Sequence, residues 1–407
     1  MLLRLTISVF VLLSASFPST TALNNGLGLV PSMGFNTWYD VFMNPTEDSC
    51  LALVDAIKAT GLYDAGYHYF NLDDGVFSGR DANGTLVANP SQFPNGIQSL
   101  VDRVHAAGMK FGIYTDRGTQ TCGGRPGAQG YETIDANFYA SIGVDFLKED
   151  SCNASPDEET AFAEYARMRD ALNKTGRPIY FNLCGWNTYY APIGHSLANS
   201  WRTGGDDGNW EGILGNVDNA AGIVQYQGPG GFNDLDYLLG KNAQGGVAQT
   251  DLQARAQFSL YSVITSPLII SQDLTKISDY SIVTYTNREV IAVNQDPRGA
   301  GGIRLVGGDL RPCINGSTCL NVWGKPLVDG SWVITVVNAG SQVVTNFTCG
   351  LATNCLTATG WLPTQKLVPR DLWQHQDLPG VQAQQGVVVP SLQALGGSAM
   401  FKLTPVW

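Results

Sequence analysis

The sequence predicts an α/β protein, a (β/α)8 TIM barrel over residues 23–300 followed by a C-terminal antiparallel β-sandwich over residues 301–407. Two observations predict the barrel. Short apolar runs alternate with amphipathic stretches of helical period, and most of the runs end in polar or charged side chains. A third observation predicts the second domain: after the glycine-rich stretch 299–308, short alternating runs are separated by Gly, Asn and Pro, with no segment of helix length.

Eight runs have the character of buried strands, and eight β/α units over about 270 residues fit the size of this barrel. They are Met33–Trp38, Tyr67–Asp74, Lys110–Asp116, Val144–Asp150, Pro178–Trp186, Ser200–Asp206, Gly230–Asp236 and Pro267–Ser271. Between them, Asp48–Thr60 and Glu158–Asn173 show the clearest helical spacing of apolar residues. Since parallel strands deliver their C-terminal residues to one face, the polar strand ends are expected to meet there.

The N-terminus has the pattern of a secretory signal peptide over residues 1–22. Arg4 precedes the apolar run Ile7–Leu13, and small residues ending in Ala22 follow as a cleavage site. A buried N-terminal helix is the alternative interpretation. The run is too short to span a bilayer, no later segment is apolar enough, and no membrane association is expected.

Sequons and cysteines favour a secreted, extracellular glycoprotein. Eight cysteines in an oxidising compartment are expected to pair for the most part, and Cys313/Cys319 and Cys349/Cys355 are each close enough in sequence to close a small loop. Five Asn-x-Ser/Thr sites are candidates for glycosylation: Asn83, Asn153, Asn173, Asn315 and Asn346.

Composition excludes several classes of function. The net charge is −11 and there is no basic patch, which argues against nucleic-acid binding. Only four histidines occur, none beside a Ser or Cys nucleophile motif, so a Ser-His-Asp hydrolase lacks its parts. No Walker-type loop and no metal-ligand spacing appears, so we expect neither cofactor nor metal. The sequence does not set the oligomeric state.

The strongest candidate nucleophile is Asp150. Glycoside hydrolysis needs two carboxyl groups that flank the scissile bond. Strand alternation places Lys148 and Asp150 on one side, where the lysine would keep the carboxylate ionised, and Glu149 on the other, towards the helices. A purely structural Lys148/Asp150 ion pair is the alternative, and Glu149 would be the nucleophile only if the strand bulged.

Asp206 is the candidate acid/base. It follows Gly204 and Gly205, which allow a sharp turn, and an ionised Asp150 nearby is expected to raise the pKa of Asp206. Its neighbour Asp207 competes for the role. Asp73 and Asp74 fit sugar hydroxyls, a cation or a helix cap, and no EF-hand spacing supports a cation.

These residues together resemble glycoside hydrolase family 27, the family of α-galactosidases and α-N-acetylgalactosaminidases. The similarity runs from Leu29 to about Pro297, and the C-terminal β domain matches in kind. The motifs, in family order, are Met-Gly-Phe-Asn-Thr-Trp at 33–38, the stretch 61–74 ending in Asn-Leu-Asp-Asp, Lys-Glu-Asp-Ser-Cys at 148–152, Trp-Arg-Thr at 201–203, Asn-Asp-Leu-Asp at 233–236 and Glu-Val-Ile-Ala-Val-Asn-Gln-Asp-Pro at 289–297.

The resemblance implies a retaining double displacement with Asp150 as nucleophile and Asp206 as acid/base. It places Trp38 against the apolar face of the sugar, with Asp73 and Asp74 on the 4- and 6-hydroxyls. Lys148 would bind the 3- and 4-hydroxyls and Arg202 would lie near the 2-hydroxyl, while Tyr114 and Asp236 form the wall. A disulfide between Cys122 and Cys152 would hold the nucleophile loop.

The sequence departs from the family pattern at several positions. Gly75 replaces a bridging cysteine, which leaves Cys50 and Cys184 as expected free thiols, and Glu149 replaces a common aromatic residue. Tyr237 stands where Met is common. Near the 2-position of the sugar, Gly185 and Thr188 are expected to leave extra room. The binding residues expected in this stretch are Cys184, Gly185, Trp186, Thr188 and Tyr189.

The sequence therefore predicts a secreted, exo-acting α-galactosidase that acts on small or polymeric carbohydrates. An α-N-acetylgalactosaminidase or β-L-arabinopyranosidase of the same chemistry is the alternative. A catalytically silent sugar-binding protein is the alternative of a different class, but both catalytic acids are present.

Overall fold

The computed structural model describes residues 23 and 25–406. The expected signal peptide, residues 1–22, lies outside the described residues. Eight parallel strands form the barrel, and each lies inside one of the eight predicted runs: β1 (Met33–Asn36), β2 (Tyr69–Asn71), β5 (Lys110–Asp116), β6 (Phe146–Asp150), β7 (Tyr180–Leu183), β8 (Ser200–Arg202), β9 (Phe232–Asp234) and β10 (Leu268–Ile270). The predicted barrel is thereby confirmed.

The strand order β10-β1-β2-β5-β6-β7-β8-β9 follows the sequence once around the sheet. The two outer strands are joined just beyond β9, where Leu238 forms a parallel bridge with Ile270. There the Leu238 amide donates to Ile269 O at 2.8 Å and the Ser271 amide donates to Leu238 O at 3.0 Å. Most of the strands are shorter than the predicted runs, because the polar residues at the run ends form the loops that shape the site.

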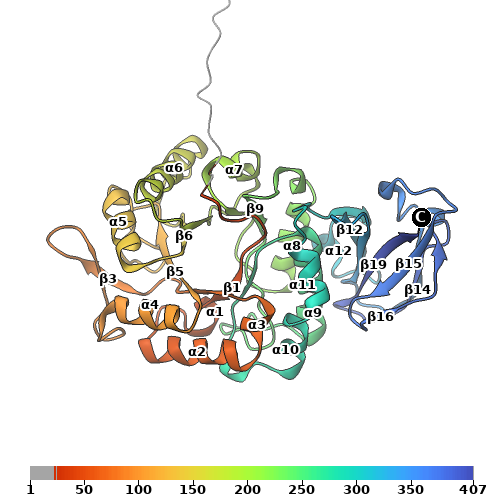
Figure 1. Cartoon of the computed structure of the whole chain (residues 1–407), viewed down its shortest axis with the longest axis horizontal. Coiled ribbons are helices and arrows are strands. Elements are labelled where there is room, and N and C mark those ends of the chain that lie inside the picture. Colours follow the sequence, from red (N-terminus) through yellow and green to blue (C-terminus); the bar gives the residue numbers. More distant parts are fainter. Residues whose placement is uncertain (1–22, 24, 407) are drawn as a thin grey trace, which may run out of the picture.

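Helices cover the outside of the curled sheet (Figure 1). The longer helices are α2 (Glu47–Ala59), α4 (Gly96–Ala106), α5 (Glu132–Ile142), α6 (Glu158–Lys174), α8 (Trp210–Ala220) and α9 (Asp251–Ile264), and α2 and α6 match the two clearest predicted stretches. Thr46 and Thr250 close capping boxes at the starts of α2 and α9, which satisfies their free amides. The shorter helices are α1 (Trp38–Val41), α3 (Leu62–Ala65), α7 (Gly194–Leu197), α10 (Asp279–Tyr285), α11 (Arg288–Asn294) and α12 (Leu310–Cys313).

One insertion was not predicted. The chain leaves β2 into a hairpin, β3 (Phe77–Arg80) and β4 (Leu86–Ala88), which projects from the barrel (Figure 1). Arg80, next to the turn of the hairpin, ties it to the barrel because its guanidinium binds both carboxylate oxygens of the buried Asp135 on α5, at 2.6 and 2.7 Å.

The C-terminal part consists of antiparallel strands, as predicted. One sheet has the order β11-β12-β13-β19-β15-β16, with β17 beside β15, and β14 pairs with β18 in a second sheet. The strands are β11 (Ile303–Val306), β12 (Leu320–Pro326), β13 (Trp332–Asn338), β14 (Val344–Cys349), β15 (Lys366–Asp371), β16 (Gln376–Asp377), β17 (Val381–Gln382), β18 (Val387–Leu392) and β19 (Gly397–Val406). Apolar residues of both sheets share one core, so the two sheets form a sandwich.

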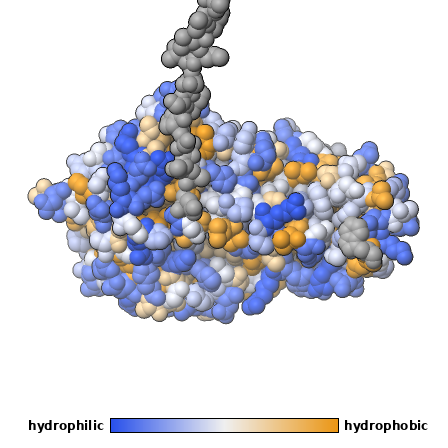
Figure 2. Space-filling model, turned by 45° about the horizontal axis from the view of Figure 1, so that its top comes forward, coloured by the Kyte–Doolittle hydropathy of each residue, from blue (hydrophilic) through white to orange (hydrophobic). Residues whose placement is uncertain are grey.

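The sandwich lies beside the barrel (Figure 1), with β12, β13 and β19 packed on α9. Trp323 on β12 is fully buried. Among the described residues, no helix combines the length and hydropathy needed to cross a bilayer. The face shown in Figure 2 intersperses polar and apolar residues.

Candidate active site

A pocket of about 580 Å³, counting the space at its mouth, opens at the C-terminal ends of the barrel strands. This volume lies in the usual range for small-ligand sites. The residues that line it are Trp38, Tyr39, Asp73, Asp74, Tyr114, Cys122, Lys148, Asp150, Cys152, Trp186, Arg202, Asp206, Asp236 and Tyr237. The structure thus brings together both predicted catalytic acids and most of the predicted binding residues.

Asp150 ends β6 and faces the pocket. Its Oδ2 accepts a hydrogen bond from the Tyr114 hydroxyl at 3.0 Å and lies 3.9 Å from Lys148 Nζ, while its Oδ1 accepts from the Ser151 amide at 2.9 Å. Burial raises the pKa of Asp150, and the Lys148 charge opposes this shift. Three polar neighbours therefore orient a carboxyl group that is nearly withdrawn from solvent.

Glu149 lies on the other side of β6, as the alternation predicts. It is fully buried, and neither carboxyl oxygen has a hydrogen-bond partner within the part of the chain that the structure describes. Burial raises the pKa of Glu149 well above its ordinary value, which favours the uncharged acid. Glu149 does not line the pocket and takes no part in the site.

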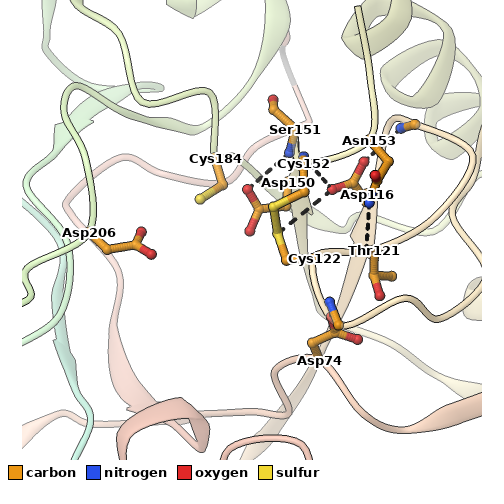
Figure 3. Close-up of a disulfide and its surroundings, with 12 residues drawn as sticks. Asp74, Asp116, Thr121, Cys122, Asp150, Ser151, Cys152, Asn153, Cys184 and Asp206 are labelled. Atoms are coloured by element: carbon orange, nitrogen blue, oxygen red, sulfur yellow. Dashed lines mark hydrogen bonds between the residues drawn. A yellow bond between two sulfur atoms is a disulfide. The ribbon is translucent and has the colours of Figure 1, made fainter. Parts of the chain in front are cut away.

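Asp206 comes from the loop after β8 and points into the same space as Asp150 (Figure 3). Its side chain is 63% exposed, and its Oδ1 lies 3.1 Å from Arg202 NH2. Asp207, the sequence-level competitor, is fully buried and does not line the pocket. Of the two neighbours, only Asp206 can reach a bound ligand.

The expected direction of the Asp206 pKa shift was wrong. Burial acts to raise it, but the charges of Arg202 and Lys148 and the hydrogen bond from Arg202 together lower the pKa of Asp206 below its ordinary value. Sequence reasoning considered repulsion from Asp150 and did not place Arg202 against the acid. The ion pair with Arg202, rather than repulsion from the second carboxylate, therefore sets the direction of the pKa shift.

Asp73 and Asp74 follow β2 and lie at the wall of the pocket opposite Asp206. Asp73 Oδ2 accepts from Asn36 Nδ2, Lys148 Nζ and the Tyr237 hydroxyl, each at 2.9 Å, and Lys148 also donates to the Tyr237 oxygen at 2.9 Å. Asp74 accepts from the backbone amides of Gly75 and Gly123, both at 2.7 Å. These acids are held rigidly at the pocket surface, where they can accept from ligand hydroxyls.

Comparison with known proteins places this arrangement in a family. A protein-family model described as "Alpha galactosidase A" matches residues 39–296. A second family model, described as "Alpha galactosidase C-terminal beta sandwich domain", matches residues 317–403. The chain belongs to the α-galactosidase family, glycoside hydrolase family 27.

Individual relatives agree with this assignment. A protein of Dictyostelium discoideum named as a probable α-galactosidase is 39% identical over 376 residues, covering 91% of this chain and 92% of its own length. The crystal structure of α-galactosidase I from Mortierella vinacea superposes with a TM-score of 0.84 at 31% identity, covering 93% of this chain and 98% of that one. The α-galactosidase of Saccharomyces cerevisiae with raffinose gives 0.82 at 29% identity, with coverages of 95% and 100%.

Gly185, one of the departures from the usual family sequence, has different surroundings from those predicted. Gly185 was expected to leave open room beside the sugar, yet a Cβ there would lie 2.1 Å from the ring of Tyr190. Tyr190 is fully buried and fills that side. Gly185, Thr188, Tyr189 and Cys184 do not line the pocket, so the predicted extra space at Gly185 is absent.

Trp186 is the member of this segment that reaches the pocket. It is 36% exposed, has a positive φ of 58°, and donates from Nε1 to Cys184 Sγ at 3.2 Å. A left-handed backbone is unusual for a bulky residue, and it turns the indole to the pocket rim. Cys184 is a buried free thiol, as is Cys50, as expected for a family member that lacks the bridging cysteine at Gly75.

The structure contains disulfides at Cys122–Cys152, Cys313–Cys319 and Cys349–Cys355. The first joins the loop after β5 to the loop after β6, directly beside Asp150 (Figure 3). Asp116 braces the same junction, accepting from the amides of Gly118 and Cys152, both at 2.7 Å. Both cysteines next to Asp116 and Asp150 are bonded to each other, so this cluster offers no thiolate ligands to a metal.

Two residues with roles at the site, Tyr39 and Asn36, were not predicted from the sequence, and Asp207 was predicted only as a competitor of Asp206. Tyr39 lines the pocket, Asn36 orients Asp73, and Asp207 lies buried behind Asp206. Asn36 is the last residue of β1 and Tyr39 directly follows the predicted Trp38, so their closeness to this strand end was the signal in the sequence. Burial of Asp207 had no signal in the sequence.

Proposed function

We propose that this family member is a secreted, exo-acting α-galactosidase that works by double displacement with retention. The observation that carries the proposal is the placement of Asp150 and Asp206. Two acids from different strands, one buried and one exposed, point into one pocket (Figure 3). Retaining glycosidases require such a pair on either side of the anomeric carbon.

In the first step, an Asp150 oxygen forms a bond to C1 of the galactosyl unit while the bond from C1 to the leaving oxygen breaks. Asp206 transfers its proton to that oxygen, and the aglycone departs. In the second step, Asp206 takes a proton from water, the water oxygen bonds to C1, and Asp150 is released as carboxylate. Tyr114 and the Ser151 amide hold Asp150 in line throughout.

The opposite wall supports preference for a galactosyl unit. Asp73 and Asp74 are buried, hydrogen-bonded acceptors, and Lys148 and Tyr237 are donors beside them. A sugar whose hydroxyls do not reach these groups would leave buried polar atoms unpaired, which costs about 1–3 kcal/mol each.

Three features support secretion. The five sequon asparagines are all exposed, six of the eight cysteines form three disulfides, and the first 22 residues have the pattern of a leader. Expression in a eukaryotic host tests this. We expect the protein in the medium, beginning near residue 23, with an apparent mass that falls on endoglycosidase treatment. Retention of residues 1–22 inside the cell would contradict the proposal.

The activity is tested with nitrophenyl α-galactoside, α-N-acetylgalactosaminide and β-L-arabinopyranoside. We expect the α-galactoside to turn over fastest, and NMR of the first-formed sugar to show α-galactose. Asp150→Asn should abolish turnover, with Glu149→Gln as the matched control that keeps it. First formation of β-galactose, or full activity of Asp150→Asn, would refute the mechanism. Preference for the second or third substrate would assign the alternative specificity.

A further inference from the structure

Asp207, the residue that follows the exposed Asp206, points its side chain into the protein interior. Asp207 is fully buried, and its Oδ1 accepts from Asn216 Nδ2 on α8 at 2.7 Å. The same amide nitrogen donates to Gly205 O at 2.8 Å. A Cβ on Gly204 would lie 1.8 Å from the Asn216 side-chain oxygen, so glycine is what permits this close approach. One asparagine therefore holds the residues on both sides of Asp206.

Asp207 also links this loop to the turn after β9. Its backbone amide donates to Asp236 Oδ2 at 2.8 Å. Its Oδ2 lies 2.6 Å from the hydroxyl of Tyr261 and 3.3 Å from Gln257 Nε2, both on α9. Tyr261 and Gln257 reach on to the carbonyls of Leu235 and Tyr237, which flank Asp236. The network thus connects two strand ends of the pocket.

The number of hydrogens available at the Tyr261 hydroxyl indicates whether the neighbouring Asp207 carboxyl group is protonated. Its hydroxyl carries one hydrogen but lies 2.5 Å from Leu235 O and 2.6 Å from Asp207 Oδ2. A backbone carbonyl can only accept. Both short contacts are hydrogen bonds only if Tyr261 donates to Leu235 O and a protonated Asp207 donates to Tyr261.

The charges around Asp207 agree. Within the described chain no Lys, Arg or His lies at ion-pair distance from it. The nearby cation, Arg202, lies 3.1 Å from Asp206 and 3.0 Å from Asp236. The titratable groups that face this region are Arg202, Asp206, Asp236, Tyr261 and Tyr39. A third carboxylate here would be buried without a partner, which is costly.

We propose that Asp207 is held as a neutral carboxylic acid and serves as a positioning residue for the acid/base Asp206. As a neutral acid it accepts from Asn216 on α8 and donates to Tyr261 on α9. The charge of Arg202 then remains available to Asp206 and Asp236. This inference rests on the proposed function, since it assigns Asp206 its role. It adds a residue that acts through Asp206 without touching the sugar.

The first test compares Asp207→Asn with Asp207→Leu. Asparagine keeps a neutral hydrogen-bonding group, so we expect kcat/KM within about threefold of wild type and an unmoved alkaline limb of the pH profile. Leucine removes the hydrogen bonds. We expect a loss of about 10–100-fold in kcat/KM for raffinose, whose leaving group needs a proton, and little loss for a dinitrophenyl α-galactoside, whose leaving group does not.

The opposite outcomes overturn the inference. If Asp207 were ionised, Asp207→Asn would remove a negative charge beside Asp206, lower the Asp206 pKa and move the alkaline limb to lower pH by about one unit. Equal losses of Asp207→Leu on both substrates would mean a merely structural role. Failure of the proposed function is distinguishable, because it would appear as normal activity in Asp206→Asn whatever the behaviour of Asp207 variants.

A second measurement does not require Asp207→Asn to fold. Two buried acids, Glu149 and Asp207, should remain protonated at about pH 8, where exposed and ion-paired carboxyls are ionised. In Glu149→Gln we expect the infrared spectrum to keep a carboxylic-acid C=O band that belongs to Asp207. Absence of that band in Glu149→Gln would show Asp207 to be ionised and would overturn the proposal.

Discussion

Arg202 NH2 lies 3.1 Å from Asp206 Oδ1, and its other nitrogen NH1 lies 3.0 Å from Asp236 Oδ1. One guanidinium is thereby shared between the acid/base candidate and a wall carboxylate. Burial raises the pKa of Asp236 to about 7, against the effect of Arg202, whereas Arg202 and Lys148 lower that of the more exposed Asp206. The lowered pKa favours the ionised form of Asp206, so the proton needed for the first step is most available in acid.

The first prediction concerns this ion pair. Replacing Arg202 by Gln removes a charge that lowers the Asp206 pKa, so the pKa rises and protonated Asp206 persists to higher pH. We expect the alkaline limb of kcat/KM to move up by about one pH unit, alongside a loss of overall activity. Arg202→Lys keeps the positive charge and is the control. Its alkaline limb of kcat/KM should lie closer to the wild-type pH than that of Arg202→Gln. A limb that moves down in Arg202→Gln would exclude the proposed electrostatics.

The second prediction concerns Tyr237. Its hydroxyl donates to Asp73 Oδ2 and accepts from Lys148, both at 2.9 Å. Tyr237→Phe removes one of the three donors to Asp73 Oδ2 and loosens two binding residues. We expect kcat/KM for the α-galactoside to fall about 5–30-fold, which corresponds to about 1–2 kcal/mol. Tyr180→Phe removes a buried hydroxyl at the opposite end of the barrel, bonded to Asn199 O, and should leave the kinetics unchanged.

The third prediction concerns Gly185. In Gly185→Ala the new Cβ would lie 2.1 Å from Tyr190 Cε2, and the buried ring is packed against Tyr189, Phe162 and Tyr165. We expect a loss of about 1–3 kcal/mol in the free energy of unfolding, measured by denaturant titration. Gly222→Ala, where a Cβ meets nothing within 4 Å, is the control. Full stability of Gly185→Ala would mean that the space beside Gly185 is open and would contradict the packing of Tyr190 against it.

The fourth prediction concerns Lys325, on β12 where the sandwich packs on the barrel. It is 1% exposed, and its Nζ donates to Thr265 Oγ1 at 2.6 Å. Burial lowers the Lys325 pKa to about 7. The unfolded lysine titrates near 10.4, so the unfolded state binds more protons between those values and wild-type stability rises with pH across that window. Below pH 7 both states are charged and the full cost of the buried cation is present.

Lys325→Met should therefore stabilise the protein by about 2–4 kcal/mol below pH 7, with the gain shrinking towards pH 10. Thermal and denaturant unfolding across this pH range measure it. Lys241→Met, at a lysine side chain that is 57% exposed, should show no such dependence. A gain from Lys325→Met that stays constant with pH would contradict the assigned pKa.

Residue order alone predicted most of the side chains that line the pocket, including both candidate catalytic acids. Asp150 and Lys148 alternate on one strand, Asp206 follows two glycines, and the barrel rule sends all strand ends to one face, so local pattern and connectivity were sufficient. The paired acids, the wall of Asp73 and Lys148, and the class of fold could thus be predicted.

Contacts between distant segments decided what the sequence left open. Arg202 reverses the expected pKa shift of Asp206, Tyr190 fills the space expected at Gly185, and α8 and α9 bury Asp207 while its neighbour stays exposed. Each effect depends on distances of a few ångströms between side chains from different elements. Periodicity fixes which face a residue takes, but the electrostatic and steric environment on that face arises only when the elements pack.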